Sequence, residues 1–581
     1  MSLLRRQIAR RCIYGLDIND MAVELARLAL WIHTFVPGLP MSNLDHGLVN
    51  ANSLTGIASV EEAADALAGL SEKFISAPIA EDDDPSANGD LFFDDQSNLF
   101  DRTHTRRPST GYQAWLVGVL RSHLEEARPI LLDVANALEA TKAQVQEATT
   151  LLARARQAAE PAQRIFDAAV VARLGDEHLL PEVTRPEHLG RLTDTAALSE
   201  AAAPLMPAHL PFLFPEVFAR DEPGFDVIIG NPPWDKVRWE AAPFWARVSP
   251  GLMSLPDTER DARIEQLRLD RPVEAAREAA EMLERHRLQE YYKKAFPWRG
   301  GTHLELAQLM MERALRAIRS NGHVALVLPR QSLVLAGWKR LRKVVFSRHT
   351  VDLVQARNAG GWIFEGVHAS YAVVLLSASP PSQQPVSVGV VTSAAELRAA
   401  TKNAPMVRIT TDELAALSDT MVVPWFATAG DRAIFDKLRQ FPRLAGNDGW
   451  VTGIHDARWD FRGSGPDRSL RSATESPGSW AVMMTRHVDA YAIRDTPAKQ
   501  FLDDWAGAAA KGKGIEIDAM GVPSFTREHP VVLVRHPSRS DDTRTLIATA
   551  MPVEGFVHNK GYVHGIACLG RLSESAVLMI G

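Results

Sequence analysis

A short apolar run that ends in Gly-Asn-Pro-Pro-Trp constrains this chain more than any other feature. Residues 225–229 (Phe-Asp-Val-Ile-Ile) have the apolar character of a buried central strand in a parallel sheet. Gly230 releases the chain from the sheet, and Asn231 offers an amide side chain at the strand end. Pro232 and Pro233 fix φ and lack N–H groups, so their carbonyls are rigid acceptors. Such a loop fits a planar group that carries an exocyclic amine.

The chemistry of this loop predicts how the amine is held. The amine donates one hydrogen to the Asn231 side-chain oxygen and the other to the Pro232 carbonyl, while the ring stacks on Trp234. Asn-Pro-Pro also occurs in ordinary turns, so these residues alone do not distinguish a catalytic loop from a plain turn. The preceding run at 212–218, Phe-Leu-Phe-Pro-Glu-Val-Phe, makes the pattern more specific.

Together the two motifs resemble those of large restriction–modification and phage-defence DNA methylases of the type IIG, BREX and DISARM kinds. The Asn-Pro-Pro-aromatic form is similar to that of the adenine-specific members. The resemblance implies that Asn231, Pro232, Pro233 and Trp234 are catalytic, that S-adenosylmethionine donates the methyl group, and that N6 of adenine in double-stranded DNA accepts it. It also implies that Phe364 stacks on the second face of a flipped adenine. Core packing is the alternative for Phe364, and the implied chemistry needs no metal.

The resemblance implies a Rossmann-like α/β methyltransferase sheet with a cofactor site at its strand ends. Residues 12–17 (Cys-Ile-Tyr-Gly-Leu-Asp) predict a strand ending in Asp17, followed by a helix with Asp20 as its cap. By resemblance, Asp17 binds the cofactor ribose, Asn52 binds the cofactor adenine, and Asn231 is a third cofactor contact. A capping or turn role is the alternative for Asp17 and for Asn52.

The chain divides by composition into five segments. We predict a first methyltransferase part at 1–56, an acidic and helical insertion at 57–210, a catalytic part at 211–378, a linker at 379–420, and a mixed α/β target-recognition domain at 421–581. Within the insertion, residues 113–173 predict helices with a break near Pro129. They form either a hairpin or a partner-binding coiled coil.

One motif of the resembled family is missing. A complete enzyme has a glycine-rich loop after its first strand, and no such loop precedes residue 12. That strand would lie between the strands bearing Asp17 and Asn231, whose facing edges are otherwise unpaired. We therefore expect the distal part of a larger or split methylase, completed by an N-terminal segment or another subunit. The alternative to an active enzyme is a catalytically incomplete fragment that binds DNA or a partner.

Composition allows DNA binding only through local patches. The net charge is −7, and seven acidic residues fall within 81–95, a stretch without Lys or Arg. The candidate DNA contacts are Lys236, Arg238, Lys339, Arg342, Arg535, Arg539, Arg544 and Lys560. Ordinary solvated faces are the alternative for these residues.

Several broad classes are disfavoured. The sequence has no apolar run of about 18 residues, no signal peptide and two cysteines, which predicts a cytoplasmic protein. Methylation of RNA or of a protein glutamine is a rival activity, against which the large C-terminal region counts. The motifs do not indicate the DNA recognition sequence.

Overall fold

The computed structural model describes most of the chain to residue 440 and separate segments beyond it. The described residues are 2–40, 44–68, 111–137, 139–181, 188–193, 196–300, 304–365, 371–381, 386–403, 406–426, 428–440, 451–455, 467–475, 479–489, 492–493, 498, 501–504, 515–517, 523–525, 531–535, 548–550, 556–558 and 563–568. They fall into two compact units, Met1–Ala433 and Ile434–Gly581. The acidic stretch 81–95 lies outside the described residues.

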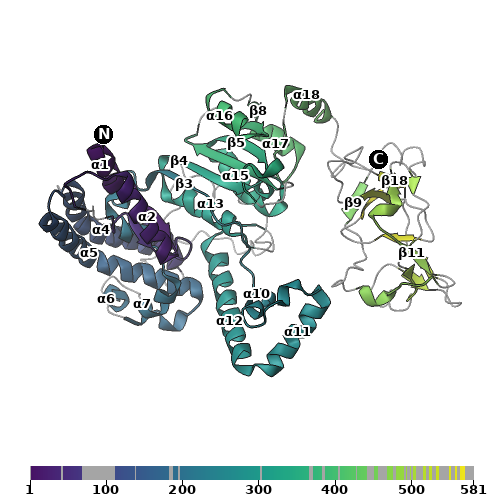
Figure 1. Ribbon diagram of the computed structural model, residues 1–581, viewed down its shortest axis with the longest axis horizontal. Helices are drawn as coiled ribbons and strands as arrows, with labels where there is room; N and C mark the ends of the chain where they lie inside the picture. Colours follow the sequence, from purple (N-terminus) through teal and green to yellow (C-terminus); the bar gives the residue numbers. More distant parts are fainter. Residues whose placement is uncertain are drawn as a thin grey trace, which may run out of the picture. The chain divides into compact units, whose positions relative to one another are not determined.

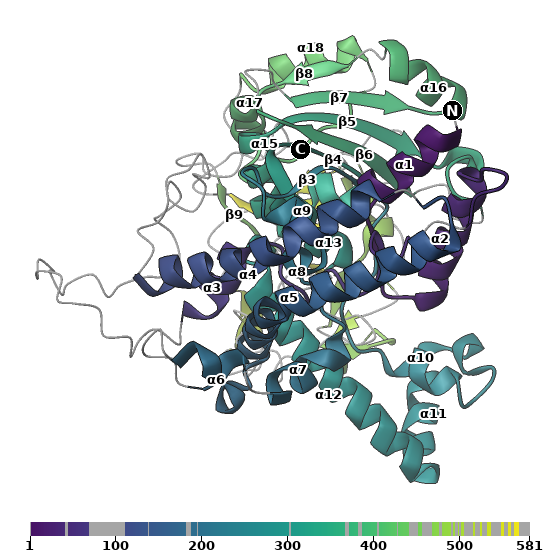
Figure 2. The ribbon, with the colours of Figure 1, turned by 90° about the vertical axis from the view of Figure 1, so that its left-hand side faces the viewer.

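A six-stranded mixed sheet forms the centre of the first unit (Figure 2). In spatial order its strands are β3 (Phe225–Gly230), β4 (Ile318–Pro329), β6 (Ala372–Ser379), β5 (Thr350–Arg357), β7 (Val386–Val391) and β8 (Val407–Ile409). β3 is parallel to β4, whereas β6 is antiparallel to both β4 and β5. The strands β3, β4 and β5 therefore share one direction, and their carboxyl ends lie at one edge of the sheet. The predicted α/β class is confirmed.

A separate two-stranded parallel sheet carries the first predicted cofactor residues. It pairs β1 (Gly15–Asp17) with β2 (Leu48–Asn50), and the helices α1 (Ser2–Cys12) and α2 (Asp20–His33) flank β1 in sequence. The Asn19 side chain accepts the backbone N–H groups at the start of α2, so Asn19 is the helix cap. The prediction that Asp20 caps this helix is wrong by one residue.

The helices of the insertion pack on one another. They are α3 (Val60–Ala66), α4 (Gly111–Asn136), α5 (Lys142–Leu174), α6 (Leu189–Thr193) and α7 (Ala196–Ala202). α4 continues through Pro129, so the predicted break there is wrong. Leu124 and Leu131, on either side of the proline, are buried in the core that α4 shares with α5. This burial outweighs the cost of about 3 kcal/mol that an interior proline imposes. The chain turns only before Thr141, which caps α5.

Further helices follow the insertion in sequence, and the last of them crosses the boundary between the two units at Ala433. They are α8 (Leu210–Leu213), α9 (Pro215–Phe218), α10 (Ala241–Ala246), α11 (Asp257–Asp270), α12 (Pro272–Ala295), α13 (Leu306–Ala317), α14 (Gln331–Val334), α15 (Lys339–Arg348), α16 (Ala394–Asn403), α17 (Thr411–Leu417) and α18 (Ala429–Leu438). Figure 1 shows α10, α11 and α12 extending from the sheet as an arm. In the part of the chain that the structure describes, no helix is both long enough and apolar enough to cross a membrane.

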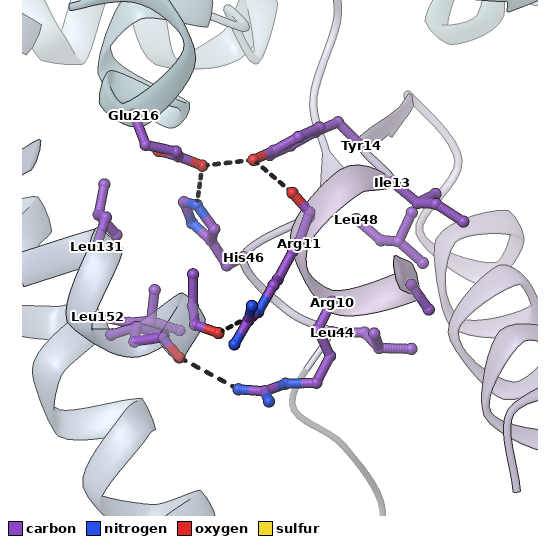
Figure 3. A pocket seen from close by; sticks show the side chains of 14 residues that line it. Arg10, Arg11, Ile13, Tyr14, Leu44, His46, Leu48, Leu131, Leu152 and Glu216 are labelled. Atoms are coloured by element: carbon purple, nitrogen blue, oxygen red, sulfur yellow. Dashed lines mark hydrogen bonds and ion pairs between the residues drawn. The ribbon is translucent and has the colours of Figure 1, made fainter. Parts of the chain in front are cut away.

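The run at 212–218 connects the small sheet to the large one. Glu216 of α9 lies 2.9 Å from the Tyr14 hydroxyl, which donates to it, and 2.6 Å from His46 Nε2 (Figure 3). Tyr14 directly precedes β1, and its ring lies 5.5 Å from the ring of Phe225 at the start of β3. The run therefore holds the starts of β1 and β2 beside β3.

The outer side of β3 is open. Within the described residues, β3 pairs with β4 alone and β1 pairs with β2 alone. Val227 is 59% exposed and Ile229 is 82% exposed. The prediction that 225–229 is a buried strand is therefore wrong, because Val227 and Ile229 are exposed and Phe225 and Ile228 are only half-buried. Apolar side chains of an interior parallel strand are normally covered on both faces.

The second unit consists of short strands in small sheets. One sheet has the order β10-β14-β11-β19 and another β18-β17-β20-β9, and two pairs are β12-β13 and β15-β16. The strands are β9 (Val451–His455), β10 (Arg471–Ser472), β11 (Trp480–Met483), β12 (Val488–Asp489), β13 (Ala492–Ile493), β14 (Phe501–Leu502), β15 (Ile515–Ile517), β16 (Pro523–Phe525), β17 (Val531–Arg535), β18 (Ala548–Ala550), β19 (Phe556–His558) and β20 (Val563–Cys568).

Candidate active site

The Asn-Pro-Pro-Trp loop begins where β3 ends. Asn231 is exposed, Pro232 is buried and Trp234 is half-buried. The Trp234 indole N–H donates to the carbonyl of Val327 in β4 at 3.3 Å, which fixes the ring against the neighbouring strand. Among the described residues, no hydrogen bond engages the Asn231 side chain. The loop therefore presents an available amide beside an anchored aromatic ring.

Phe364 reaches this loop from the segment that follows β5. The rings of Phe364 and Trp234 meet edge to face, with centroids 5.7 Å apart and an angle of 83° between their planes. The two rings contact each other, so a base can lie between them only after they separate.

Asn358 determines the conformation of the Phe364 segment. This fully buried side chain accepts the backbone N–H groups of Ile363 and Phe364, each at 3.0 Å, and donates to the Phe364 carbonyl at 3.0 Å. Three hydrogen bonds from one amide leave the segment little freedom. The sequence did not single out Asn358, because its partners are ordinary backbone groups.

Asp17 is the last residue of β1, and Asn52 lies two residues after β2. One oxygen of the exposed Asp17 carboxylate accepts the Asn19 N–H at 2.8 Å. The Asn52 side-chain oxygen accepts the Leu54 N–H at 3.0 Å, and the Asn52 side chain also contacts the Tyr292 hydroxyl. Burial raises the pKa of Tyr292 to about 12, so this hydroxyl is protonated at neutral pH. Asn52 therefore shapes the turn in which it lies.

A buried ion network supports the turn after β2. Glu62 of α3 lies 2.9 Å from Arg173 of α5 and 2.8 Å from Arg313 of α13. Arg313 also donates to the Gly56 carbonyl at 2.8 Å. The Tyr291 hydroxyl of α12 donates to the Thr55 carbonyl at 2.6 Å. Burial opposes the charge on Glu62, but Arg313 and Arg173 outweigh it and hold the pKa of this carboxyl well below its usual range. The network joins the insertion and α13 to this turn.

The predicted DNA contacts in the first unit have different surroundings. Lys236 and Arg238 are exposed, and Arg238 is paired with Glu240. Lys339 is half-buried at the start of α15. Arg342 is buried, donates to the Ser332 and Thr420 carbonyls, and has a pKa that burial lowers to about 10. A guanidinium used in this way faces the interior, so we leave Arg342 out of the proposed DNA surface.

Four further predicted contacts belong to the second unit. Arg535 is the last residue of β17, and the structure describes its backbone but not its side chain. Arg539, Arg544 and Lys560 lie outside the described residues. These four DNA contacts therefore stay predictions.

One protein-family model matches the part of the chain that contains Asp17, Asn52 and Asn231. The matching family model is described as Eco57I restriction-modification methylase. The model matches residues 11–242. The resemblance to restriction–modification methylases is confirmed. No curated protein matches the chain significantly.

Solved structures of restriction enzymes show a weak overall likeness to the chain. The type IIG restriction endonuclease BpuSI is 13% identical with a TM-score of 0.25, over 90% of this chain and 65% of that one. The type IIL restriction-modification enzyme MmeI, in complex with DNA, is 10% identical with a TM-score of 0.29, over 71% of this chain and 55% of that one. The chain thus spans under two thirds of the length of either structure.

Proposed function

We propose that this chain transfers a methyl group from S-adenosylmethionine to N6 of adenine in double-stranded DNA, within a restriction–modification or phage-defence system. The observation that carries the proposal is the available Asn231 amide beside the anchored Trp234 ring, within a segment of the methylase family. A base that leaves the stack costs a few kcal/mol. The faces of Trp234 and Phe364 would offset part of this cost once their edge-to-face contact opens.

The proposed chemistry depends on where the amine hydrogens go. Asn231 Oδ1 and the Pro232 carbonyl accept the two hydrogens of the adenine amine. These hydrogen bonds would raise the electron density on the amine nitrogen. The nitrogen would form a bond to the methyl carbon as the bond from that carbon to the sulfonium sulfur breaks, and the amine would then release one proton to water. When bound, S-adenosylmethionine supplies the electrophilic methyl group. The donor set suits this cofactor, because the Asp17 carboxylate can accept two ribose hydroxyls and the Asn52 amide can meet an adenine edge.

An Asn231→Ala variant tests the assignment. With the adenine bound, the variant leaves one amine hydrogen of the enclosed base without its acceptor, which costs about 1–3 kcal/mol, so turnover should fall roughly 5- to 150-fold. Turnover is measured as N6-methyladenine by mass spectrometry of digested DNA. Asn321→Ala is the matched control, because Asn321 is exposed near the start of β4, away from the strand ends. Full turnover by Asn231→Ala, or a product methylated on cytosine, contradicts the proposal.

The open edges favour a second candidate, a subunit that is incomplete by itself. We propose that another polypeptide segment supplies a parallel strand between β1 and β3. One strand in that position would pair both free edges, and residues flanking it in the same segment would pack against Val227 and Ile229, which are 59% and 82% exposed. A second copy of the chain would pair only one of these edges in each protomer.

Co-expression tests the second candidate. The chain is produced together with the polypeptide encoded immediately upstream, and the complex is measured by size-exclusion chromatography with light scattering. We expect a one-to-one complex that Ile229→Lys weakens. Leu283→Lys, on the 62% exposed Leu283 of α12, should leave the complex intact. A chain that stays alone or forms a homodimer, or a complex indifferent to Ile229→Lys, contradicts the complementing strand.

A further inference from the structure

Two arginines lie at the edge formed by the carboxyl ends of β4 and β5, and neither has an acidic partner among the described residues. Arg330 directly follows β4, and Arg357 is the last residue of β5. Both flank the first residue of β6, because the Arg330 N–H donates to the Ala372 carbonyl at 3.0 Å and Arg357 lies opposite Ala372 in the sheet register. The sheet therefore places these two side chains close together, although they are far apart in sequence.

The two guanidinium groups share one aromatic surface. The Arg330 and Arg357 guanidinium carbons lie 5.2 Å and 5.8 Å from the ring centre of Trp425. Gln355, which is fully buried, accepts from Arg330 Nε at 3.2 Å and donates to the Pro424 carbonyl at 3.0 Å. Gln355 thereby fixes both the arginine and the segment that carries the tryptophan. Within the described ranges, neither arginine forms an ion pair with a carboxylate.

This arrangement has an electrostatic cost that an anion can remove. Burial, and next the charge of Arg357, lower the pKa of Arg330. Three other arginines of the unit that stack on an aromatic ring, Arg247, Arg313 and Arg316, each pair with a carboxylate. Arg247, for example, lies over Phe244 and bonds to Glu281. Two like charges held together without a counter-ion favour a ligand with several anionic oxygens.

We propose that Arg330 and Arg357, held on Trp425, bind a backbone phosphate of the DNA strand that carries the target adenine. The inference rests on the proposed function and names a DNA contact of that same site. Asn358, which sets the Phe364 segment, is the residue next to Arg357, so a phosphate bound here lies beside the proposed position of the base. A phosphate contact positions the duplex and does not read its sequence.

Salt-dependent DNA binding by the full chain tests the proposal. Fluorescence anisotropy with a labelled duplex gives the slope of log K against log salt concentration. Arg330→Ala and Arg357→Ala should each weaken binding to the same extent for all duplex sequences and lower the slope. The double variant should lower it by about 0.9, the value for one phosphate. Arg357→Lys keeps the charge and should keep the slope. Arg247→Ala is the matched control and should leave both affinity and slope unchanged.

Each outcome is decisive. Unchanged affinity and slope in both alanine variants overturn the phosphate site and leave the proposed function standing. A loss confined to particular duplex sequences also overturns it, since that result indicates a base contact. Absence of DNA binding by the wild-type chain overturns both proposals. DNA binding with the expected slopes but without methyl transfer contradicts the proposed function alone.

Discussion

Replacing Glu62 by Gln tests how firmly the buried ion network holds the insertion to α13 and to the turn after β2. The Glu62 side chain is 5% exposed, and the side chains of its partners Arg173 and Arg313 are 8% and 4% exposed. Glutamine keeps the shape and an acceptor but leaves two buried guanidinium groups without a counter-ion. Removal of one partner from a buried ion pair costs roughly 3–5 kcal/mol. Because glutamine retains an acceptor, we expect the free energy of unfolding to fall by about 3 kcal/mol, the lower end of this range.

The matched control is the neighbouring residue. Glu61 pairs with Arg121, and their side chains are 45% and 50% exposed. An exposed pair of this kind contributes about 0–1 kcal/mol, so Glu61→Gln should be nearly neutral. Urea denaturation followed by tryptophan fluorescence measures both variants. Equal stability of Glu62→Gln and Glu61→Gln would refute the conclusion that the network is energetically important.

The same residue predicts a dependence on pH. Burial acts to raise the pKa of Glu62, but Arg313 and Arg173 outweigh burial, so its pKa is lower in the folded chain than in the unfolded chain. A group of this kind contributes stability above its unfolded pKa and loses that contribution as the pH falls through its folded pKa. The stability difference between wild type and Glu62→Gln should therefore be constant near neutral pH and shrink only in acid.

Two further predictions follow from buried side chains. Burial raises the pKa of Glu312 to about 7, so the folded chain binds more protons than the unfolded chain and stability should fall as the pH rises from about 4.5 to about 7. Glu312→Gln should abolish this fall in urea midpoints, and a wild-type midpoint that does not change over this range contradicts the prediction. Asn358→Ala removes three hydrogen bonds and should accelerate hydrogen exchange at the Ile363 and Phe364 amides. Unchanged exchange there would mean that other contacts hold the segment.

The sequence predicted secondary structure well where it depends on residues that are adjacent in the chain. The strand before Asn231 and the helix after Asp17 could be predicted, because apolar spacing and capping groups act over a few residues. The helix cap was misplaced by one residue because Asn19 and Asp20 are both good caps and only the backbone decides between them. The continuation of α4 through Pro129 depends on its burial against α5, which local propensity does not include.

The parts of the site that the sequence did not reveal depend on pairing between distant segments. Arg330 and Arg357 come together only through their shared register with Ala372 in β6. The role of Asn358 depends on backbone groups several residues further along the chain, such as the Ile363 N–H, which reach its side chain only in the folded loop. The exposure of Ile229 reflects which strand lies beside β3, a property of the sheet and not of the apolar run itself.

Calorimetric titration of S-adenosylmethionine into the 581-residue chain tests the central claim most directly. The titration is performed with the chain alone and after addition of the upstream-encoded polypeptide. We predict saturable binding in at least one of the two samples, weakened by Asp17→Ala. Binding only after the addition would identify the chain as one part of a split methylase. No saturable binding in either sample would contradict the claim that this chain forms a methyl-donor site.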